Sequence, residues 1–205
     1  HLCRSEKRRI AMAIHHNHFY LGLIMLVSLG IGVFFITRLG LYPVAFVNWR
    51  PIMARDFRTM ADSAFSFYLR AIDTYKRGSF TDADAAKLYA EIQRATLDKL
   101  IEGELLSNEL DLRFGGRGVT EVDKKLLSIE NGKLEAAASA LYGLTDEEFK
   151  KMVLEPQAKR EILAEEFKGK NEDFSVWLLD QKRKADIYVL IPGLVWGDAA
   201  GLPQN

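Results

Sequence analysis

Residues 19–37 form a run, FYLGLIMLVSLGIGVFFIT, that contains no charged side chain. A helix of about 20 apolar residues spans a hydrocarbon core of about 30 Å. A soluble core helix of this length would need a polar face, and the run shows none. The run is longer than the roughly 7–15 apolar residues of a signal peptide, and Pro43 and Val44 make the sequence beyond it a poor cleavage site. We therefore expect an uncleaved transmembrane anchor over residues 19–38.

The direction of this anchor is predicted from the cations that flank it. Four cations cluster between Arg4 and Arg9, before the run, whereas Arg38 and Arg50 are the nearest ones after it. Because the excess of positive charge stays in the cytoplasm, residues 1–18 are expected to form a cytoplasmic tail. The protein is then expected to be a single-pass protein of the cytoplasmic (inner) membrane, with its C-terminal domain extracytoplasmic.

Charge and cysteine usage exclude several classes of function. Lys+Arg and Asp+Glu are equal at 28 each, so net charge favours neither a nucleic-acid partner nor an acidic substrate. Cys3 is the single cysteine and precedes the apolar run, which excludes a disulfide framework and argues against lipid attachment. His15, His16 and His18 lie together without a partner cysteine or carboxylate pattern, and we interpret them as solvated. No metal and no cofactor are predicted.

After the anchor, apolar residues recur at helical spacing through most of the chain. A domain that is mainly α is therefore predicted over residues 39–192, followed by a tail at 193–205. Glycines at 114–118 are interpreted as a helix end and turn rather than a phosphate loop. Pro156 is expected to kink the helix that contains it. The expected helices cover 54–77, 79–110, 120–131, 134–142, 145–168 and 172–185. Their expected N-caps are Thr81 or Asp82, Thr120, and Thr145 in a capping box with Glu148.

Two short strand-like segments lie near the ends of this domain. Residues 43–47 are rich in strand formers, and a lone strand cannot satisfy its own backbone groups. Residues 186–191 form a second such run, so we expect a small two-stranded β element that joins the ends of the domain. Residues 50–53 either form a further short strand or lead straight into a helix, and Pro51 excludes them from a central strand position.

Four motifs occur in an order that resembles a known family. They are VAFVNWRPIMARDF at 44–57, TLDKLIEGELL at 96–106, GRGVTEVDKKL at 116–126 and LYGLTDEEFKKMV at 141–153. Together they resemble the N-terminal chaperone domain of SurA-type proteins, which also begins membrane-anchored folding factors of the PpiD and PrsA type. The resemblance covers residues 44–185 and implies a SurA-like helical domain that binds polypeptide.

The chain departs from this family in two ways. Trp49 stands where the family usually has glycine after Val-Asn, which predicts a looser or differently shaped hairpin turn. Such proteins often carry a parvulin prolyl-isomerase domain of roughly 90 residues. Only 20 residues follow Ala185, and no His or Cys occurs after His18. The resemblance is therefore to the family without its parvulin domain.

The main hypothesis is a non-catalytic chaperone-like domain that binds unfolded or newly translocated polypeptides near the membrane. Its chemistry would be apolar contact by flexible Met and aromatic side chains. A homo-oligomer stays open, because Ser28 and Gly32 form a small-xxx-small pair that allows two spans to pack. The candidate peptide-binding residues are Met60, Phe65, Phe67, Tyr68, Met152, Phe174 and Trp177.

Two alternatives belong to other classes. An enzyme with a Ser-His-Asp, Cys-His or His-containing metal site is excluded for residues 39–205, which contain no His and no Cys. A prolyl isomerase remains open only if this chain is the N-terminal fragment of a parvulin-type enzyme. A scaffold subunit that binds one folded partner is the third hypothesis. A long apolar groove would favour the chaperone, and a flat apolar patch would favour the scaffold.

Overall fold

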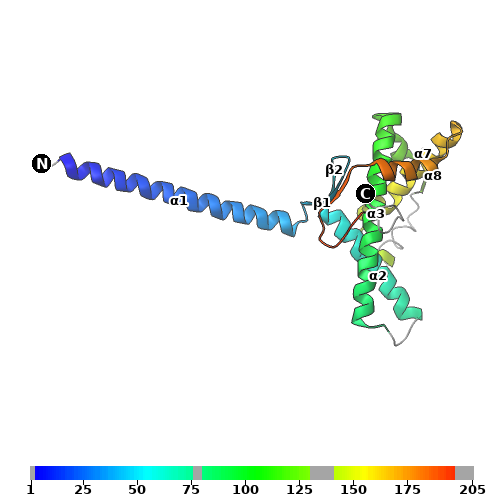
Figure 1. Ribbon diagram of the computed structural model, residues 1–205, viewed down its shortest axis with the longest axis horizontal. Helices are drawn as coiled ribbons and strands as arrows, with labels where there is room; N and C mark the ends of the chain where they lie inside the picture. Colours follow the sequence, from blue (N-terminus) through cyan, green and yellow to red (C-terminus); the bar gives the residue numbers. More distant parts are fainter. Residues whose placement is uncertain (1–2, 76–79, 130–140, 197–205) are drawn as a thin grey trace. The chain divides into compact units, whose positions relative to one another are not determined.

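The computed structural model describes residues 3–75, 80–129 and 141–196 of the chain (Figure 1). The chain divides into two compact units, His1–Tyr42 and Pro43–Asn205. The first unit contains helix α1, Cys3–Arg38. In its described part, the second unit contains six α-helices, one π-helical turn and a three-stranded antiparallel sheet. The prediction of a mainly α domain with a small β element is therefore confirmed.

Helix α1 ends by means of its own sequence. Gly40 has a φ of 65° and follows the last turn. Its N–H donates to the Thr37 carbonyl at 3.3 Å, and the Leu41 N–H donates to the Ile36 carbonyl at 3.0 Å. This pair of bonds is the Schellman motif, which satisfies carbonyls that the helix end would otherwise leave free. Glycine suits the left-handed position because it has no Cβ.

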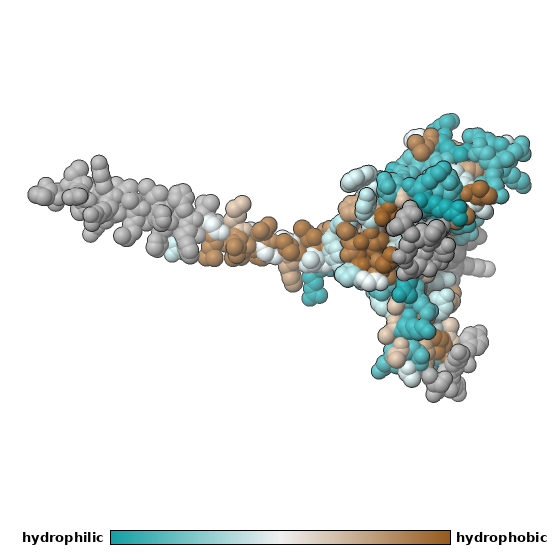
Figure 2. Space-filling model, in the orientation of Figure 1, coloured by the Kyte–Doolittle hydropathy of each residue, from teal (hydrophilic) through white to brown (hydrophobic). Residues whose placement is uncertain are grey.

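The described part of α1 exposes apolar side chains around the helix (Figure 2). Ile24, Met25, Leu26 and Leu29 are each 65–74% exposed. Among the residues that the structure describes, no helix combines the length and the apolar character needed to cross a membrane.

The sheet of the second unit has three strands rather than the two expected. Strand β1, Pro43–Val47, lies between β2, Arg50–Met53, and β3, Ile187–Val189, and both pairings are antiparallel. Residues 50–53 therefore form a strand before the helix begins, which settles the two alternatives. Pro51 lies in β2 at one edge of the sheet, where the lack of a backbone N–H is tolerated.

The hairpin turn between β1 and β2 differs from the expectation that Trp49 would loosen it. Val47 pairs with Arg50, so the turn contains only Asn48 and Trp49. Both have positive φ, 48° and 67°, as tight two-residue hairpins of type I′ require. The turn is therefore not looser, because Trp49 itself adopts the left-handed conformation that glycine would otherwise supply.

Strand β3 joins the two ends of the domain, as predicted. Val47 pairs with Ile187, and the Leu190 N–H donates to the Val44 carbonyl at 2.8 Å. The Asn48 side chain strengthens this junction, because its Oδ1 accepts from the Asp186 N–H at 3.0 Å. The last strand thus closes the domain onto its first strand.

Helices α2, Ala54–Tyr75, and α3, Asp82–Phe114, lie side by side and contact the sheet (Figure 1). Thr81 caps α3, as one of the two predicted candidates. Its side chain accepts from the Asp84 N–H, and Asp84 accepts from the Thr81 N–H at 3.0 Å. This capping box satisfies two donors at the helix start. The predicted end of the preceding helix at Gly78 lies outside the described residues.

Helix α4, Arg117–Ile129, begins earlier than predicted. Gly115 ends α3 with a φ of 57°, in agreement with the predicted turn. The helix then resumes at once, so Thr120 lies inside α4 and is not its N-cap. Gly118 permits this, since a Cβ there would lie 2.5 Å from Leu110 Cδ2. Of the predicted helix over 134–142 and the turn at 131–132, all but residues 141 and 142 lies outside the described residues.

The next helical segment changes its hydrogen-bonding pattern in the middle. Thr145 and Glu148 form the predicted capping box at the start of α6, Asp146–Phe149. A π-helical turn, η2, covers Lys150–Leu154, and α7 covers Glu155–Gly169. The Glu155 N–H donates to the Lys150 carbonyl. Pro156 lies in the first turn of α7, where its missing N–H is least disruptive. A π turn thus precedes Pro156, and the predicted kink at Pro156 stays a prediction.

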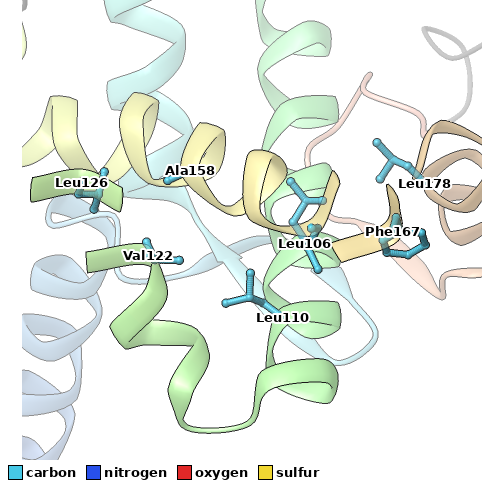
Figure 3. Close-up of a cluster of buried hydrophobic side chains, with 8 residues drawn as sticks. Leu106, Leu110, Val122, Leu126, Ala158, Phe167 and Leu178 are labelled. Atoms are coloured by element: carbon cyan, nitrogen blue, oxygen red, sulfur yellow. The ribbon is translucent and has the colours of Figure 1, made fainter. Parts of the chain in front are cut away.

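Helix α8, Phe174–Lys184, completes a core cluster of eight buried residues (Figure 3). Asp173 caps this helix by accepting from the Ser175 and Val176 N–H groups at 2.8 and 3.1 Å. Lys182 Nζ ties α8 to α3 through Asp98, at 3.1 Å, and Glu102, at 3.0 Å. The cluster draws on α3, α4, α7 and α8. Its buried members are Leu106, Leu110, Val122, Leu126, Ala158, Leu163, Phe167 and Leu178.

Candidate functional site

An apolar groove lies where α2 and α3 meet the segment from Tyr142 to Val153. Its volume is about 500 Å³. Helix α2 supplies one wall, α3 the second, and the α6–η2 segment the third. The lining residues are Met60, Ser63, Ala64, Tyr68, Leu88, Glu91, Ile92, Ala95, Thr96, Lys99, Tyr142, Leu144, Met152 and Val153.

The floor of the groove belongs to a small core cluster. Leu144, Phe149 and Met152 are its buried members, with 5–8% of their surface exposed. Met60 packs against them from α2 and is only partly buried. Methionine thioethers fill irregular space and adapt to different neighbours. The floor is therefore apolar and deformable.

Aromatic contacts hold the third wall against α2. The Phe67 and Tyr142 rings stack with centroids 5.2 Å apart and planes at 14°. Ser63 Oγ donates to the Tyr142 carbonyl at 2.6 Å, which fixes the backbone just before the turn. Gly143 follows with a φ of 65°, a conformation that favours glycine. This turn brings Leu144 and the capped helix α6 under α2.

The rim of the groove is partly open to solvent. Tyr68 is 49% exposed on α2, and Ala95 is exposed on α3. Glu91 and Lys99 add one charge of each sign at exposed positions along α3. A segment with an apolar core and polar flanks would complement this arrangement.

The polar groups near the groove lack the features of a catalytic site. No lining residue is His or Cys, and in the part of the chain that the structure describes no cluster of His, Cys, Asp and Glu could hold a metal ion. On the outer side of α2 and α3, Tyr89 Oη donates to Asp62 Oδ1 at 2.8 Å. Burial, together with this bond, raises the pKa of Tyr89, so its phenol stays protonated and cannot act as a base at neutral pH. The groove lining therefore offers mainly apolar contact, with Glu91 and Lys99 as its charged members.

The structure brings together four of the seven candidate peptide-binding residues. Met60, Tyr68 and Met152 line the groove, and Phe67 supports it by stacking on Tyr142. Phe65 points elsewhere and packs edge-on against Tyr89, with ring centroids 5.1 Å apart. Met152 is 7% exposed and therefore forms floor rather than rim.

The other two candidates, Phe174 and Trp177, lie apart from the groove. They stack on each other at 5.7 Å, and Phe167 lies 5.0 Å from the Trp177 ring. A second hollow of about 440 Å³ adjoins them. Its lining comes from the region of α7 and α8, where hydrophilic residues predominate on the visible surface (Figure 2). The lining residues are Phe167, Glu172, Asp173, Val176, Trp177, Leu179, Asp180 and Arg183.

Several groove residues were not among the sequence-based candidates. Tyr142 is the most informative, because it carries both the ring stack and the carbonyl contact to α2. An aromatic residue directly before Gly143 and the capping box was a usable signal for a fixed turn. Ser63 and Thr96 are buried polar residues, 8% and 4% exposed, whose role depends on packing that no local pattern displays.

Comparison of the chain with known protein families, curated proteins and solved structures gave no match.

Proposed function

We propose that this protein is a membrane-anchored, extracytoplasmic chaperone-like module that binds unfolded or newly translocated polypeptide without catalysis. The observation that carries the proposal is the open groove between α2 and α3, with its floor of Leu144 and Met152 and its exposed rim at Tyr68. An enclosed core would leave no room for a client, and a flat surface would give its side chains little to enter.

The groove chemistry suits clients of varied sequence. Apolar contact is non-directional, and it gains roughly 25 cal/mol for each Å² of apolar surface removed from water. Met60 and Met152 can adapt to side chains of different shapes. The groove therefore binds an exposed apolar segment weakly and releases it when the client folds.

The proposed anchor is supported by the uncharged run at 19–37 and by the apolar side chains that the described part of α1 exposes. In water such a surface is unfavourable, and a bilayer would cover it. The excess of cations between Arg4 and Arg9 supports an extracytoplasmic location for residues 43–205. A protease added to spheroplasts should digest residues 43–205 and spare the N-terminal tail. Protection of residues 43–205 would contradict the proposed orientation of the anchor.

The binding test uses the full chain in lipid nanodiscs and a denatured client diluted from urea. We expect the protein to suppress light scattering by the aggregating client and to leave a proline-limited refolding rate unchanged. Tyr68→Ser, at the rim, should weaken suppression. Val176→Ser is the matched control, because Val176 is 64% exposed on α8 and lies outside the groove. No suppression at several-fold molar excess, or accelerated refolding, would contradict the proposal.

A scaffold subunit is the second candidate, and its folded partner would dock on the exposed apolar side chains of α8. Val176 and Leu179 are exposed there, and Glu172, Asp173 and Asp180 surround them. A folded partner with a basic, apolar patch would complement this surface. In the scattering assay, loss of suppression with Val176→Ser and none with Tyr68→Ser would favour this hollow over the groove.

A further inference from the structure

The sheet of the second unit has two unlike faces. Ala45, Val47 and Ile52 are 0%, 0% and 4% exposed, on the face that α2 and α3 cover. Side chains alternate along a strand, so Phe46 lies on the opposite face. Its partners across the sheet are Pro51 and Tyr188. Directly paired residues share a face.

Trp49 extends this second face at the hairpin turn. Its ring lies 6.4 Å from the Tyr188 ring. We call the set Phe46, Trp49, Pro51 and Tyr188 the outer sheet face. Pro51 is exposed, Tyr188 is 57% exposed and Trp49 is 82% exposed.

The backbone at Trp49 is strained in a way that keeps the ring in solvent. A φ of 67° costs an L-residue with a side chain about 1–2 kcal/mol relative to right-handed geometry. Glycine at this position would remove that cost. Strained backbone positions occur preferentially where a side chain serves function. The indole of Trp49 contacts the Tyr188 ring and is otherwise held out in solvent, 82% exposed.

The outer sheet face carries no charged side chain. The nearest cation in the hairpin, Arg50, turns away and donates from Nη2 to Asp111 Oδ2 on α3 at 2.7 Å. The face thus presents an indole, a phenol, a phenyl ring and a proline. Trp and Tyr combine an apolar ring with a polar tip, and they are enriched at the boundary between lipid and water.

The chain length between α1 and the sheet limits how far this face can lie from the proposed anchor. Four residues, Leu39 to Tyr42, separate Arg38 from Pro43. Five Cα steps reach at most about 18 Å when fully extended. The interfacial layer of one leaflet is roughly 5–8 Å deep. The start of β1 therefore lies within about 18 Å of the end of the proposed anchor, which allows a sheet lying along the bilayer to place its outer face on the headgroups.

We propose that the outer sheet face seats on the lipid headgroup region, with Trp49 and Tyr188 as its interfacial anchors. The proposal rests on the anchor of the proposed function. Helix α2 leaves the sheet directly after β2, and its groove residues begin six positions later at Met60, about 9 Å along the helix. Seating the sheet places the groove near the membrane surface, where translocated chains emerge.

The test uses the full chain reconstituted in phosphatidylcholine vesicles with and without brominated acyl chains, which quench nearby tryptophan. We expect the wild-type emission to be quenched, and Trp49→Phe to remove more than half of that quenching. The matched control, Trp177→Phe, should leave the quenching unchanged, because Trp177 lies in the α8 cluster. Equal quenching in wild type and Trp49→Phe, or none, would overturn the proposal. If the tryptophan emission shifts to the blue with rising protein density but is not quenched by bromine, the outer sheet face contacts a second copy of the chain instead.

Vesicle flotation separates this inference from the proposed function. If the chain floats but Trp49 is not quenched, the membrane anchor is supported and the membrane contact of the outer sheet face is excluded. If the chain does not float, both proposals are excluded. Client suppression in the scattering assay depends on the groove and is independent of either result.

Discussion

The two halves of helix α3 lie in unlike surroundings. Its C-terminal half contributes Leu106 and Leu110 to a cluster that α4, α7 and α8 close from the other sides. Its N-terminal half contributes Leu88 and Ile92 to a groove that only α2 and the segment from Tyr142 to Val153 border among the described residues. One helix thus builds both the enclosed core and an open site.

The difference lies in coverage rather than in residue type. Both regions use leucine, aromatic rings and partly buried apolar side chains. In the enclosed cluster, Leu163 and Phe167 are 0% and 1% exposed, whereas Met60 at the groove is partly buried and Tyr68 is half exposed. Regions with few enclosing contacts open at lower free energy, and binding sites are drawn from them. Stability and binding should therefore respond to substitutions in different halves of the domain.

The largest effect is expected from Phe167→Ala in the enclosed cluster. Removing a fully buried ring that touches Phe174, Trp177 and the Arg113 guanidinium should lower the free energy of unfolding by about 3–5 kcal/mol. Tyr68→Ala at the groove rim should change it by no more than about 0.5 kcal/mol. Urea unfolding of the full chain measures both. Similar losses of unfolding free energy for the two variants would contradict the claim that the two halves of α3 lie in unlike surroundings.

Met152→Ala tests whether the groove floor can relax. Large-to-small core substitutions cost about 2–5 kcal/mol, depending on how well the site collapses. The loss of stability for Leu163→Ala, in the enclosed cluster, should lie at the upper end of this range. Met152→Ala should lie at the lower end, because Met60 and Val153 can move into the space beside an open groove. The same urea experiment decides, and a larger loss for Met152→Ala would show that the floor is rigid.

Two helix caps allow a matched comparison of smaller effects. Thr145→Ala removes the acceptor for the Glu148 N–H, and Asp173→Ala removes the acceptor for Ser175 and Val176. Each should cost about 1 kcal/mol of stability. Only Thr145→Ala should also weaken client suppression, because its helix carries the groove floor. Equal suppression of client aggregation by the two variants would show that the groove floor does not contribute to client binding.

The smallest effects concern pH and have opposite signs at two carboxyl groups. Burial raises the pKa of Glu104 in α3, against the attraction of Arg50 and Lys159. Protonation of Glu104 therefore favours the folded state, and this contribution grows as the pH falls through the raised pKa towards the ordinary value. The amide and hydroxyl of Thr145 lower the pKa of Glu148. Its contribution is present above the ordinary value and is lost as the pH falls through the lowered pKa.

Unfolding curves between neutral pH and about pH 2.5, well below the ordinary glutamate pKa, measure these contributions. Glu104→Gln should gain stability relative to wild type at neutral pH and lose that advantage on acidification. Glu148→Gln should be less stable than wild type at neutral pH, and the difference should narrow at the acid end. Parallel curves for wild type and either variant would contradict the assigned sign.

Local signals in the sequence predicted much of this fold. The capping boxes at Thr81 and Thr145 and the pairing of residues 43–47 with the strand near the C-terminus are present. These features depend on residues that are neighbours in sequence or on backbone groups that must find a partner. The third strand was left open, because Pro51 permits an edge strand and also permits a helix start.

The wrong predictions concern local structure that is determined by contacts between residues distant in sequence. Thr120 looked like an N-cap, but the close approach of Gly118 to Leu110 lets α4 begin at Arg117. Trp49 in the usual place of glycine predicted a looser or differently shaped turn, but the pairing of β1 with β2 leaves a tight turn of two residues.

The candidate site was predicted only in part for the same reason. Met60, Tyr68 and Met152 could be proposed from the sequence because flexible Met and aromatic side chains suit apolar contact. Phe174 and Trp177 have the same chemistry, and only packing separates them from the groove. Tyr142 joins the site through a ring stack with Phe67, 75 positions earlier in the chain, which no local pattern reveals.

The most direct test of the central claim is site-specific photo-crosslinking to an unfolded client. A benzoylphenylalanine placed at Ala95, exposed inside the groove, is compared with one at Val119, which is 64% exposed on α4 and lines neither the groove nor the α8 hollow. With the full chain in nanodiscs and a reduced, unfolded client, we expect strong crosslinking from position 95 and background from position 119. The native client should compete poorly. Equal crosslinking from the two positions, or none from position 95, would contradict binding in the groove.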